Sequence, residues 1–248
     1  KLTSGVGMKL KAHGVHLVEG TATVLGEKDE VINISCNNEI YSVKYLLLCA
    51  GSETVIPPIK GLSETEYWSS KEALELKVLP NSLAIIGGGV IGMEFASFFN
   101  SMGVKVTVIE MMPEILGVMD KETSAMLRAD YTKKGVRFLV DTKVTEVSAG
   151  KVFVEKNGKS EIIEVEKILM SVGRRPVTAN LGTEKLNIEL QRSGVKVNEF
   201  MQTSHPRVYA CGDITGYSLL AHTAIREGEV AINHILGIDD KMNYAAIP

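Results

Sequence analysis

The amino-acid sequence predicts an α/β fold with a parallel sheet, and three stretches of the 248-residue chain support this prediction. Residues 82–110 hold an apolar run, a glycine-rich turn, an apolar helix and a second apolar run, which is the pattern of a βαβ unit. Residues 143–165 alternate between polar and apolar and are broken by glycine-containing turns, which is typical of a β-meander. Residues 206–236 hold a short apolar run, a glycine turn and an amphipathic helix.

The expected elements follow from apolar periodicity and from the residues that bound each run. The N-terminal part is expected to hold a helix at 2–13 and strands at 15–18, 21–25, 31–35 and 45–49. The middle part is expected to hold helices at 69–76 and 120–134, parallel strands at 83–86, 105–109, 136–140 and 167–172, and meander strands at 143–147, 151–155 and 161–165. The last part is expected to hold a strand at 208–213 and a helix at about 219–236.

Composition argues against several classes of function. The hydrophobic content of 45% supports a sizeable core, and the net charge of -3, with both signs interspersed, leaves no basic stripe for a nucleic acid. The charge-free run 82–93 is too short and too rich in glycine to span a membrane. No metal-ligand pattern is present. The three cysteines Cys36, Cys49 and Cys211 fit a reducing compartment and are expected to be small buried hydrophobes, and Met119 and Met126 are expected to fill the core.

The glycine-rich turn predicts a dinucleotide site. Gly87, Gly89 and Gly92 have G-x-G-x-x-G spacing between an apolar strand and an apolar helix. The first glycine allows a sharp turn, the second lets the backbone approach a pyrophosphate, and the third lets the helix pack closely on the sheet. A pyrophosphate would then lie at the helix N-terminus, near Val90 and Ile91. The alternative is an ordinary βαβ unit that binds nothing.

Glu110 indicates which dinucleotide would bind. It lies eighteen residues after Gly92, at the end of the second strand, where an acid accepts hydrogen bonds from the ribose hydroxyls of NAD. No Lys or Arg follows before Lys121, whereas the 2′-phosphate of NADP requires cations. The pattern therefore favours NAD over NADP.

Three motifs in order give the chain a specific resemblance. They are GGGVIGMEFA at 87–96, SVGRRP at 171–176, and HPRVYACGDITG with LLAHTA within 205–224. Together they resemble the flavoprotein pyridine nucleotide-disulfide oxidoreductases, and within that family the branch that oxidises dihydrolipoamide. The resemblance covers nearly all of the chain and concerns the middle of the family's sequence.

The resemblance implies a fold and a domain arrangement. A Rossmann-like, three-layer NAD-binding domain with a β-meander is expected at 63–176. It would be inserted into an FAD-binding domain of the same type, incomplete here, that is formed by 1–62 and 177–248.

The resemblance also implies two cofactors, FAD and NAD, and roles for individual residues. Glu94 matches a catalytic carboxylate that pairs with a lysine near the flavin and the nicotinamide. The NAD-binding residues would be Gly87, Gly89, Val90, Ile91, Gly92, Glu110 and Gly173.

The FAD-binding residues would be Ala22, Ala50, Gly51, Arg174, Gly212, Asp213, Leu220, Ala221 and His222. Asp213 would bind the ribitol, and the helix beginning near Leu220 would stabilise negative charge on the reduced flavin. Without the resemblance, Asp213 reads as a turn-forming residue, and Ala22, Ala50 and Gly51 as plain turn residues.

Parts of the family's machinery are expected outside this chain, which starts at Lys1 without an initiator methionine. These are the first glycine motif for FAD, the C-x-x-x-x-C redox pair, and the interface domain with its His-Glu base. His222 and Glu227 have a similar spacing but lie on the helix assigned to the FAD domain. The chain alone is therefore expected to be inactive and to purify without flavin.

The parent protein is expected to be a homodimer of the bacterial cytosol, or of the mitochondrial matrix in a eukaryote. It would oxidise dihydrolipoamide on a lipoyl domain of a 2-oxo acid dehydrogenase or glycine cleavage complex, through a disulfide, FAD and NAD. The alternatives are a disulfide reductase of the coenzyme A, mercuric or glutathione type, or a non-catalytic NAD-binding module.

Overall fold

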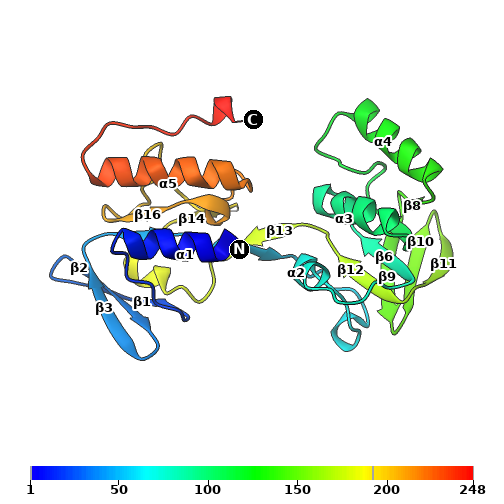
Figure 1. The fold of residues 1–248 in the computed structure, drawn as a ribbon, viewed down its shortest axis with the longest axis horizontal. Coiled ribbons are helices and arrows are strands. Elements are labelled where there is room, and N and C mark those ends of the chain that lie inside the picture. Colours follow the sequence, from blue (N-terminus) through cyan, green and yellow to red (C-terminus); the bar gives the residue numbers. More distant parts are fainter. Residues whose placement is uncertain (1, 192, 248) are drawn as a thin grey trace. The chain divides into compact units, whose positions relative to one another are not determined.

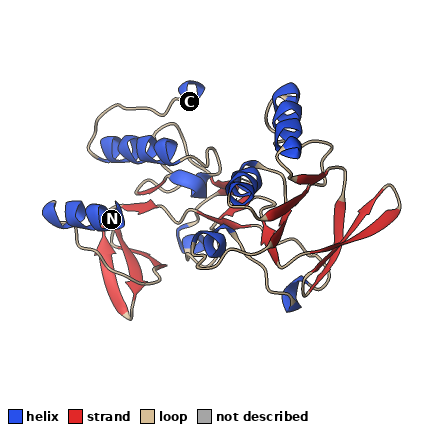
Figure 2. Cartoon of the chain, turned by 45° about the vertical axis from the view of Figure 1, so that its right-hand side comes forward, coloured by secondary structure: helices blue, strands red, loops and turns tan. Residues whose placement is uncertain are grey.

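The computed structural model describes residues 2–191 and 193–247 and divides the chain into two compact units (Figure 1). Unit 1 consists of Lys1–Ser52 and Arg175–Pro248, and unit 2 consists of Glu53–Arg174. Helices and strands occur in both units, and they can be told apart in Figure 2. Within the described residues, no helix has the length and apolar character needed to cross a bilayer.

Unit 2 is built on a four-stranded parallel sheet with the order β12-β6-β7-β8. The strands are β6 (Ser82–Ile86), β7 (Lys105–Ile109), β8 (Arg137–Leu139) and β12 (Lys167–Met170). Strand β6 lies second in the order, and four of its five residues are buried because apolar side chains leave it on both faces. All four strands were predicted from their continuous apolar runs, and their parallel pairing confirms the α/β fold class.

The sheet of unit 2 lies between helices and a second sheet, which gives three layers. On one face, Leu83 and Ile85 pack with Phe99 of α3 (Val90–Ser101) and Ala73 of α2 (Ser70–Leu74). On the other face, Ala84 and Ile86 pack with the meander, which consists of β9 (Lys143–Ser148), β10 (Lys151–Lys156) and β11 (Lys159–Glu164). The Rossmann-like arrangement with a β-meander is therefore present in unit 2.

The predicted helix starts and hairpin turns of unit 2 are also present. The Ser69 side chain accepts from Lys71 N–H at 3.2 Å, and the Glu72 carboxylate accepts from Ser69 N–H, which forms the capping box of α2. Asp120 caps α4 (Lys121–Lys133) through Thr123 N–H at 3.0 Å. Asn157 and Gly158 have φ angles of 50° and 73°, as the tight turn between β10 and β11 requires.

Unit 1 joins two segments that are far apart in sequence. Strand β4 (Leu46–Leu48) pairs in parallel with β16 (Val208–Ala210), and beside them β1 (Thr23–Lys28), β2 (Val31–Cys36) and β3 (Glu39–Val43) form an antiparallel sheet. Helix α5 (Ala221–Ile235) packs Val230 and Ala231 against Tyr209 of β16. The remaining elements of unit 1 are α1 (Leu2–Ala12), β14 (Leu190–Gln191), β15 (Gly194–Val195), η2 (Thr183–Leu186), η3 (Gly212–Thr215) and η4 (Tyr244–Ala246). In unit 2 there is also η1 (Leu62–Glu64), and the short strands β5 (Ser52–Thr54) and β13 (Arg174–Pro176) lie where the chain passes from one unit to the other.

Several predictions about unit 1 were wrong. Residues 15–18 form no strand, and Val15 and Leu17 are exposed, because no neighbouring strand pairs with them among the described residues. Strand β3 was not predicted, since it is mostly exposed and its residues carry no apolar alternation. Cys49 is exposed rather than buried, whereas Cys36 and Cys211 are buried as expected.

The two methionines expected in the core of unit 2 are exposed. Met126 is 68% exposed because the inward face of α4 carries Ser124, Leu127 and Tyr131 instead. Met119 is 52% exposed and lies in the loop before the helix cap.

Candidate functional site

The glycine turn between β6 and α3 requires glycine at its first and third positions for steric reasons. Gly87 has a φ of +108°, and a Cβ there would lie 2.4 Å from the carbonyl oxygen of Ser171. A Cβ on Gly92 would lie 2.0 Å from the carbonyl oxygen of Gly87. At Gly89, by contrast, no atom of the described residues lies within 4 Å of the Cβ position, apart from those of Gly89 and its two chain neighbours. The fold itself therefore leaves open space in front of the second glycine.

The same turn leaves the start of α3 without a side-chain cap. Gly89 occupies the N-cap position and has no side chain to accept from the first helical N–H groups. The turn is held by its neighbours instead, since Gly87 N–H donates to the Ile109 carbonyl at 2.9 Å and Leu116 N–H donates to the Gly88 carbonyl at 2.9 Å. Uncapped N–H groups at a helix start suit an anionic ligand.

Glu110 lies directly against this turn. Its Oε2 accepts from Gly88 N–H at 2.6 Å, and its Oε1 accepts from Met112 N–H at 2.8 Å. A carboxylate has roughly four acceptor positions, so two backbone bonds fix its orientation and leave capacity for further donors. The structure thus brings Glu110 and the glycine motif together.

Ser171 is a residue of this site that sequence reasoning missed. Its buried Oγ donates to the Gly87 carbonyl at 2.9 Å, and its N–H donates to the Ile86 carbonyl at 2.8 Å. It follows β12, which is adjacent to β6, so it ties the glycine turn to the sheet. The available signal was its position as first residue of the SVGRRP motif. Gly173 of that motif is exposed, has a φ of +129° and accepts from Val55 N–H at 3.0 Å.

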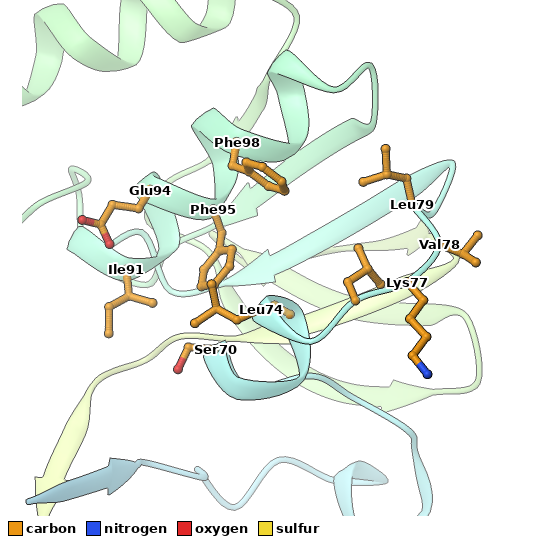
Figure 3. A pocket seen from close by; sticks show the side chains of 11 residues that line it. Ser70, Leu74, Lys77, Val78, Leu79, Ile91, Glu94, Phe95 and Phe98 are labelled. Atoms are coloured by element: carbon orange, nitrogen blue, oxygen red, sulfur yellow. The ribbon is translucent and has the colours of Figure 1, made fainter. Parts of the chain in front are cut away.

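Glu94 lines a cavity of about 480 Å³ that lies within unit 2 beside α3 (Figure 3). Ile91 lines the same cavity one helical turn earlier, which places both residues on one face of the helix. The Glu94 side chain is exposed, and the lining is otherwise mainly apolar. In Figure 3, Glu94 and Lys77 lie at opposite ends of the cavity, with Phe95 and Leu74 between them.

In unit 1, the residues after β4 and after β16 meet at the carboxyl ends of these strands. Asp213, in the 3₁₀ turn η3, accepts from the Ser52 hydroxyl at 2.5 Å. Gly212 has a φ of +77°, which L side chains rarely adopt. Because Ser52 directly follows Ala50 and Gly51, the structure brings these two residues close to Gly212 and Asp213. The carboxyl ends of parallel strands are where α/β sheets commonly bind ligands.

Glu227 holds this turn through a hydrogen bond from Gly212 N–H, a contact that the sequence analysis did not predict. It is fully buried in the interior of unit 1, where it accepts from Gly212 N–H at 2.5 Å and from the Tyr244 hydroxyl at 2.6 Å. Burial raises the pKa of Glu227 above its ordinary value, although both hydrogen bonds oppose this effect. The sequence feature that could have indicated this contact is a carboxyl side chain on the same helix face as Thr223, Val230 and Ala231, which is the buried face of α5.

The remaining predicted residues of unit 1 are exposed. Leu220 occupies the N-cap position of α5 and makes no side-chain cap, and Ala221 and His222 form the exposed first turn. Ala22 is exposed just before β1, and among the described residues no hydrogen bond joins it to Ala50 or Gly51. Arg174 belongs to unit 2, unlike the other residues assigned to FAD.

Comparison with known proteins supports the family resemblance. Residues 1–228 match the family described as "Pyridine nucleotide-disulphide oxidoreductase". The dihydrolipoyl dehydrogenase of Acholeplasma laidlawii is 41% identical, and the match covers 98% of this chain and 72% of that protein. The dihydrolipoyl dehydrogenase of Thermus scotoductus is 39% identical over 96% of this chain but only 52% of its own length. The chain therefore spans about half the length of that relative.

Other members of the same group also match. The mercuric reductase of Staphylococcus aureus is 31% identical over 92% of this chain and 42% of its own length. Among solved structures, the HOCl-induced flavoprotein disulfide reductase RclA from Escherichia coli aligns with a TM-score of 0.83 at 27% identity. That alignment covers 93% of this chain and 53% of RclA. The resemblance predicted from the three motifs is confirmed, and the chain belongs to the pyridine nucleotide-disulphide oxidoreductase family.

Proposed function

We propose that unit 2 binds NAD at the glycine turn, as part of a protein that oxidises dihydrolipoamide. The observation that carries the proposal is the Glu110 carboxylate, which Gly88 and Met112 hold beside the uncapped start of α3. The first helical N–H groups would bind the pyrophosphate, and the open space at Gly89 would admit it. Glu110 would accept from the ribose hydroxyls and would repel the 2′-phosphate of NADP.

Glu94 and Ile91 are proposed to face the nicotinamide, because they line one cavity on the same face of α3. The exposed Gly173 is proposed to approach the same cofactor with its backbone, since its positive φ is open only to glycine at low cost. Glu94 would act as the charged partner on that face.

Unit 1 is proposed to hold part of an FAD site, with Asp213 binding the ribitol. The features of unit 1 that fit FAD are the left-handed Gly212, the Asp213 carboxylate fixed by Ser52, and the uncapped, exposed start of α5. The α5 N–H groups would favour negative charge on the flavin edge. Ala50, Gly51 and Ala22 would contribute backbone contacts, and FAD would supply the two-electron carrier between NAD and a disulfide.

The substrate of the parent protein is part of the proposal. Dihydrolipoamide is favoured over mercuric ion because the two dihydrolipoyl dehydrogenases share 41% and 39% identity with this chain, against 31% for the mercuric reductase. We further propose a homodimeric parent of the bacterial cytosol or mitochondrial matrix. Its substrate would be the dihydrolipoamide of a lipoyl domain, and the 248 residues alone would not turn over.

A titration of NADH and NADPH into the chain, followed by nicotinamide fluorescence, tests the nucleotide site. We expect saturable binding of NADH and weaker binding of NADPH. Glu110→Ala should weaken NADH binding by roughly ten- to a hundredfold, because a charged hydrogen-bond acceptor worth about 1.5–3 kcal/mol is lost, and should reduce the preference for NADH over NADPH. Glu155→Ala, on the exposed side of β10, is the matched control and should leave both affinities unchanged. Equal binding of the two nucleotides by the wild type would contradict the proposed selectivity, and absence of saturation would contradict the site.

A further inference from the structure

Two cysteines from distant parts of the sequence face each other in unit 1. The Sγ atoms of Cys49 and Cys211 lie 3.4 Å apart, and both thiols are free. Each cysteine directly follows the last residue of one of the two paired parallel strands. These last residues, Leu48 of β4 and Ala210 of β16, are in register, so the two cysteines follow at matching positions. The pair is separate from the C-x-x-x-x-C pair that the family resemblance implies, because 162 positions separate its members.

The backbone at this point suits a disulfide. Neighbouring strands lie about 4.7–4.9 Å apart, which falls within the Cα separation of about 4.4–6.8 Å found across disulfides. The N–H of Cys211 donates to the Leu48 carbonyl at 3.0 Å, which holds the two strand ends in register. The Sγ atoms would need to approach from 3.4 Å to about 2.05 Å, which a small side-chain rotation can supply.

The two thiols differ in access. Cys49 is exposed to solvent, whereas Cys211 is buried, with only 8% of its surface exposed. The contact with Cys211 lowers the pKa of the Cys49 thiol, while the same contact and burial raise the pKa of Cys211. Since the thiolate is the reactive form, Cys49 is suited to react first and Cys211 to resolve the product.

We propose that Cys49 and Cys211 form a reversible disulfide by exchange with low-molecular-weight disulfides. The Cys49 thiolate attacks one sulfur of the external disulfide, forms a mixed disulfide and releases one external thiolate. Cys211 then loses its proton, attacks the Cys49 sulfur and expels the second external thiolate. Two protein thiols are oxidised to one disulfide, one external disulfide is reduced to two thiols, and each released thiolate takes up a proton.

The disulfide would lock unit 1 covalently. The closed loop runs from Cys49 to Cys211 and contains all of unit 2, so it would join the two sequence segments that now meet through β4 and β16. Cross-links that close long loops restrict the unfolded chain, so oxidation should raise the melting temperature. The proposal does not depend on the binding of either nucleotide.

Dipyridyl disulfide, added to the anaerobically reduced 248-residue chain, tests the exchange. A Cys36→Ala background removes the third cysteine, which is buried in β2. We expect two thiopyridones per chain, a product that retains no pyridylthio group, and a mass lower by two hydrogen atoms. Cys211→Ser should release one thiopyridone and keep the mixed disulfide on Cys49. Cys49→Ser should react at least tenfold more slowly.

A measurement on the unsubstituted chain guards against variants that fail to fold. After oxidation, tryptic peptides that contain Cys49 and Cys211 should migrate as one linked species until a reductant separates them. Two stable mixed disulfides on one chain would overturn the proposal. So would a Cys49 that stays unmodified in the folded protein, or a linked pair that involves Cys36.

Discussion

Glu227 shows, at the scale of a single residue, how a buried carboxyl can support the turn at Gly212 and Asp213, which is proposed to bind FAD. Its two oxygens accept from Gly212 N–H and the Tyr244 hydroxyl. Glu227→Ala should therefore lower the free energy of unfolding by about 1–3 kcal/mol, because two buried donors lose their acceptor. Urea unfolding at pH 7 measures this loss. Glu229→Ala, at an exposed position of the same helix, is the control and should cost much less.

The pKa of Glu227 gives a second test. Burial raises the pKa of this carboxyl in the folded chain, so the folded state binds its proton more tightly than the unfolded state does. The resulting stabilisation is full below the unfolded pKa and is lost as pH rises through the folded pKa. Glu227→Gln cannot titrate, so the wild type should lose stability relative to this variant as pH rises from 4 to 8. A difference that stays constant with pH would contradict the raised pKa.

Asp240 should show the opposite dependence on pH. The Arg226 guanidinium, with help from Asn233, holds the pKa of Asp240 at about 2, below its ordinary value of 3.8. The stabilisation is therefore present above pH 3.8 and is lost as pH falls through about 2. Asp240→Asn should be less stable than the wild type at pH 6 in urea unfolding, and the difference should shrink towards pH 2. A gap that persists at pH 2 would mean that the ion pair is not its source.

Residues whose positions depend on local spacing could be predicted from the sequence, and residues whose contacts are tertiary could not. Gly87, Gly92 and Glu110 were found because a strand, a turn and a helix fix their relative positions. Ser171 acts on Gly87, which lies 84 positions away, so no local pattern reveals the bond. Glu227 was noted only for its spacing from His222, because its contact with Gly212 requires knowing which strand α5 covers.

At the scale of elements, the turn between β6 and α3 contains glycines that are needed for different reasons. A Cβ on Gly92 would meet the Gly87 backbone at 2.0 Å, so Gly92→Ala must push α3 away from the sheet. We expect it to cost about 1–3 kcal/mol of stability, as overpacking commonly does. Gly89→Ala meets open space at an ordinary φ of -71° and should change stability by less than about 0.5 kcal/mol.

Gly89→Ala should affect nucleotide binding far more than its small effect on stability would suggest. Gly89→Ala should weaken NADH severalfold although the fold is intact, because its methyl group would enter the space proposed for the pyrophosphate. Urea unfolding and NADH fluorescence on both variants check the pair. A Gly89→Ala protein with wild-type affinity would remove the proposed reason for this glycine, and a fully stable Gly92→Ala protein would contradict the packing described.

Elements differ in how visible they are in the sequence for a physical reason. The strands of the parallel sheet were predicted because burial on both faces demands continuous apolar runs. Strand β3 (EIYSV) is mostly exposed and so has no such demand, whereas the apolar residues at 15–18 pair with no strand in the part of the chain that the structure describes. Hydrogen bonding to a neighbour, which defines a strand, is not encoded in a single segment.

At the scale of the whole molecule, the two units differ in how they depend on chain continuity. Unit 2 is one continuous segment, and it contains both apolar cores that flank its parallel sheet. Its two ends are adjacent, since Val55 N–H donates to the Gly173 carbonyl at 3.0 Å. Unit 1 instead needs two separate segments, because β16 pairs with β4 from the other end of the sequence.

This difference predicts that residues 53–174 fold alone and keep the proposed nucleotide site. The isolated segment should unfold cooperatively in urea and bind NADH within about threefold of the full chain, because Gly89, Ser171 and Glu110 all lie within it. Residues 175–248 alone should remain unfolded, since their strand β16 would lack β4. Well-dispersed amide NMR signals for residues 53–174 and poorly dispersed signals for residues 175–248 would support the division. An unfolded 53–174 segment would show that unit 2 requires unit 1 for its stability, and a folded segment without NADH binding would show that the glycine turn and Glu110 are insufficient.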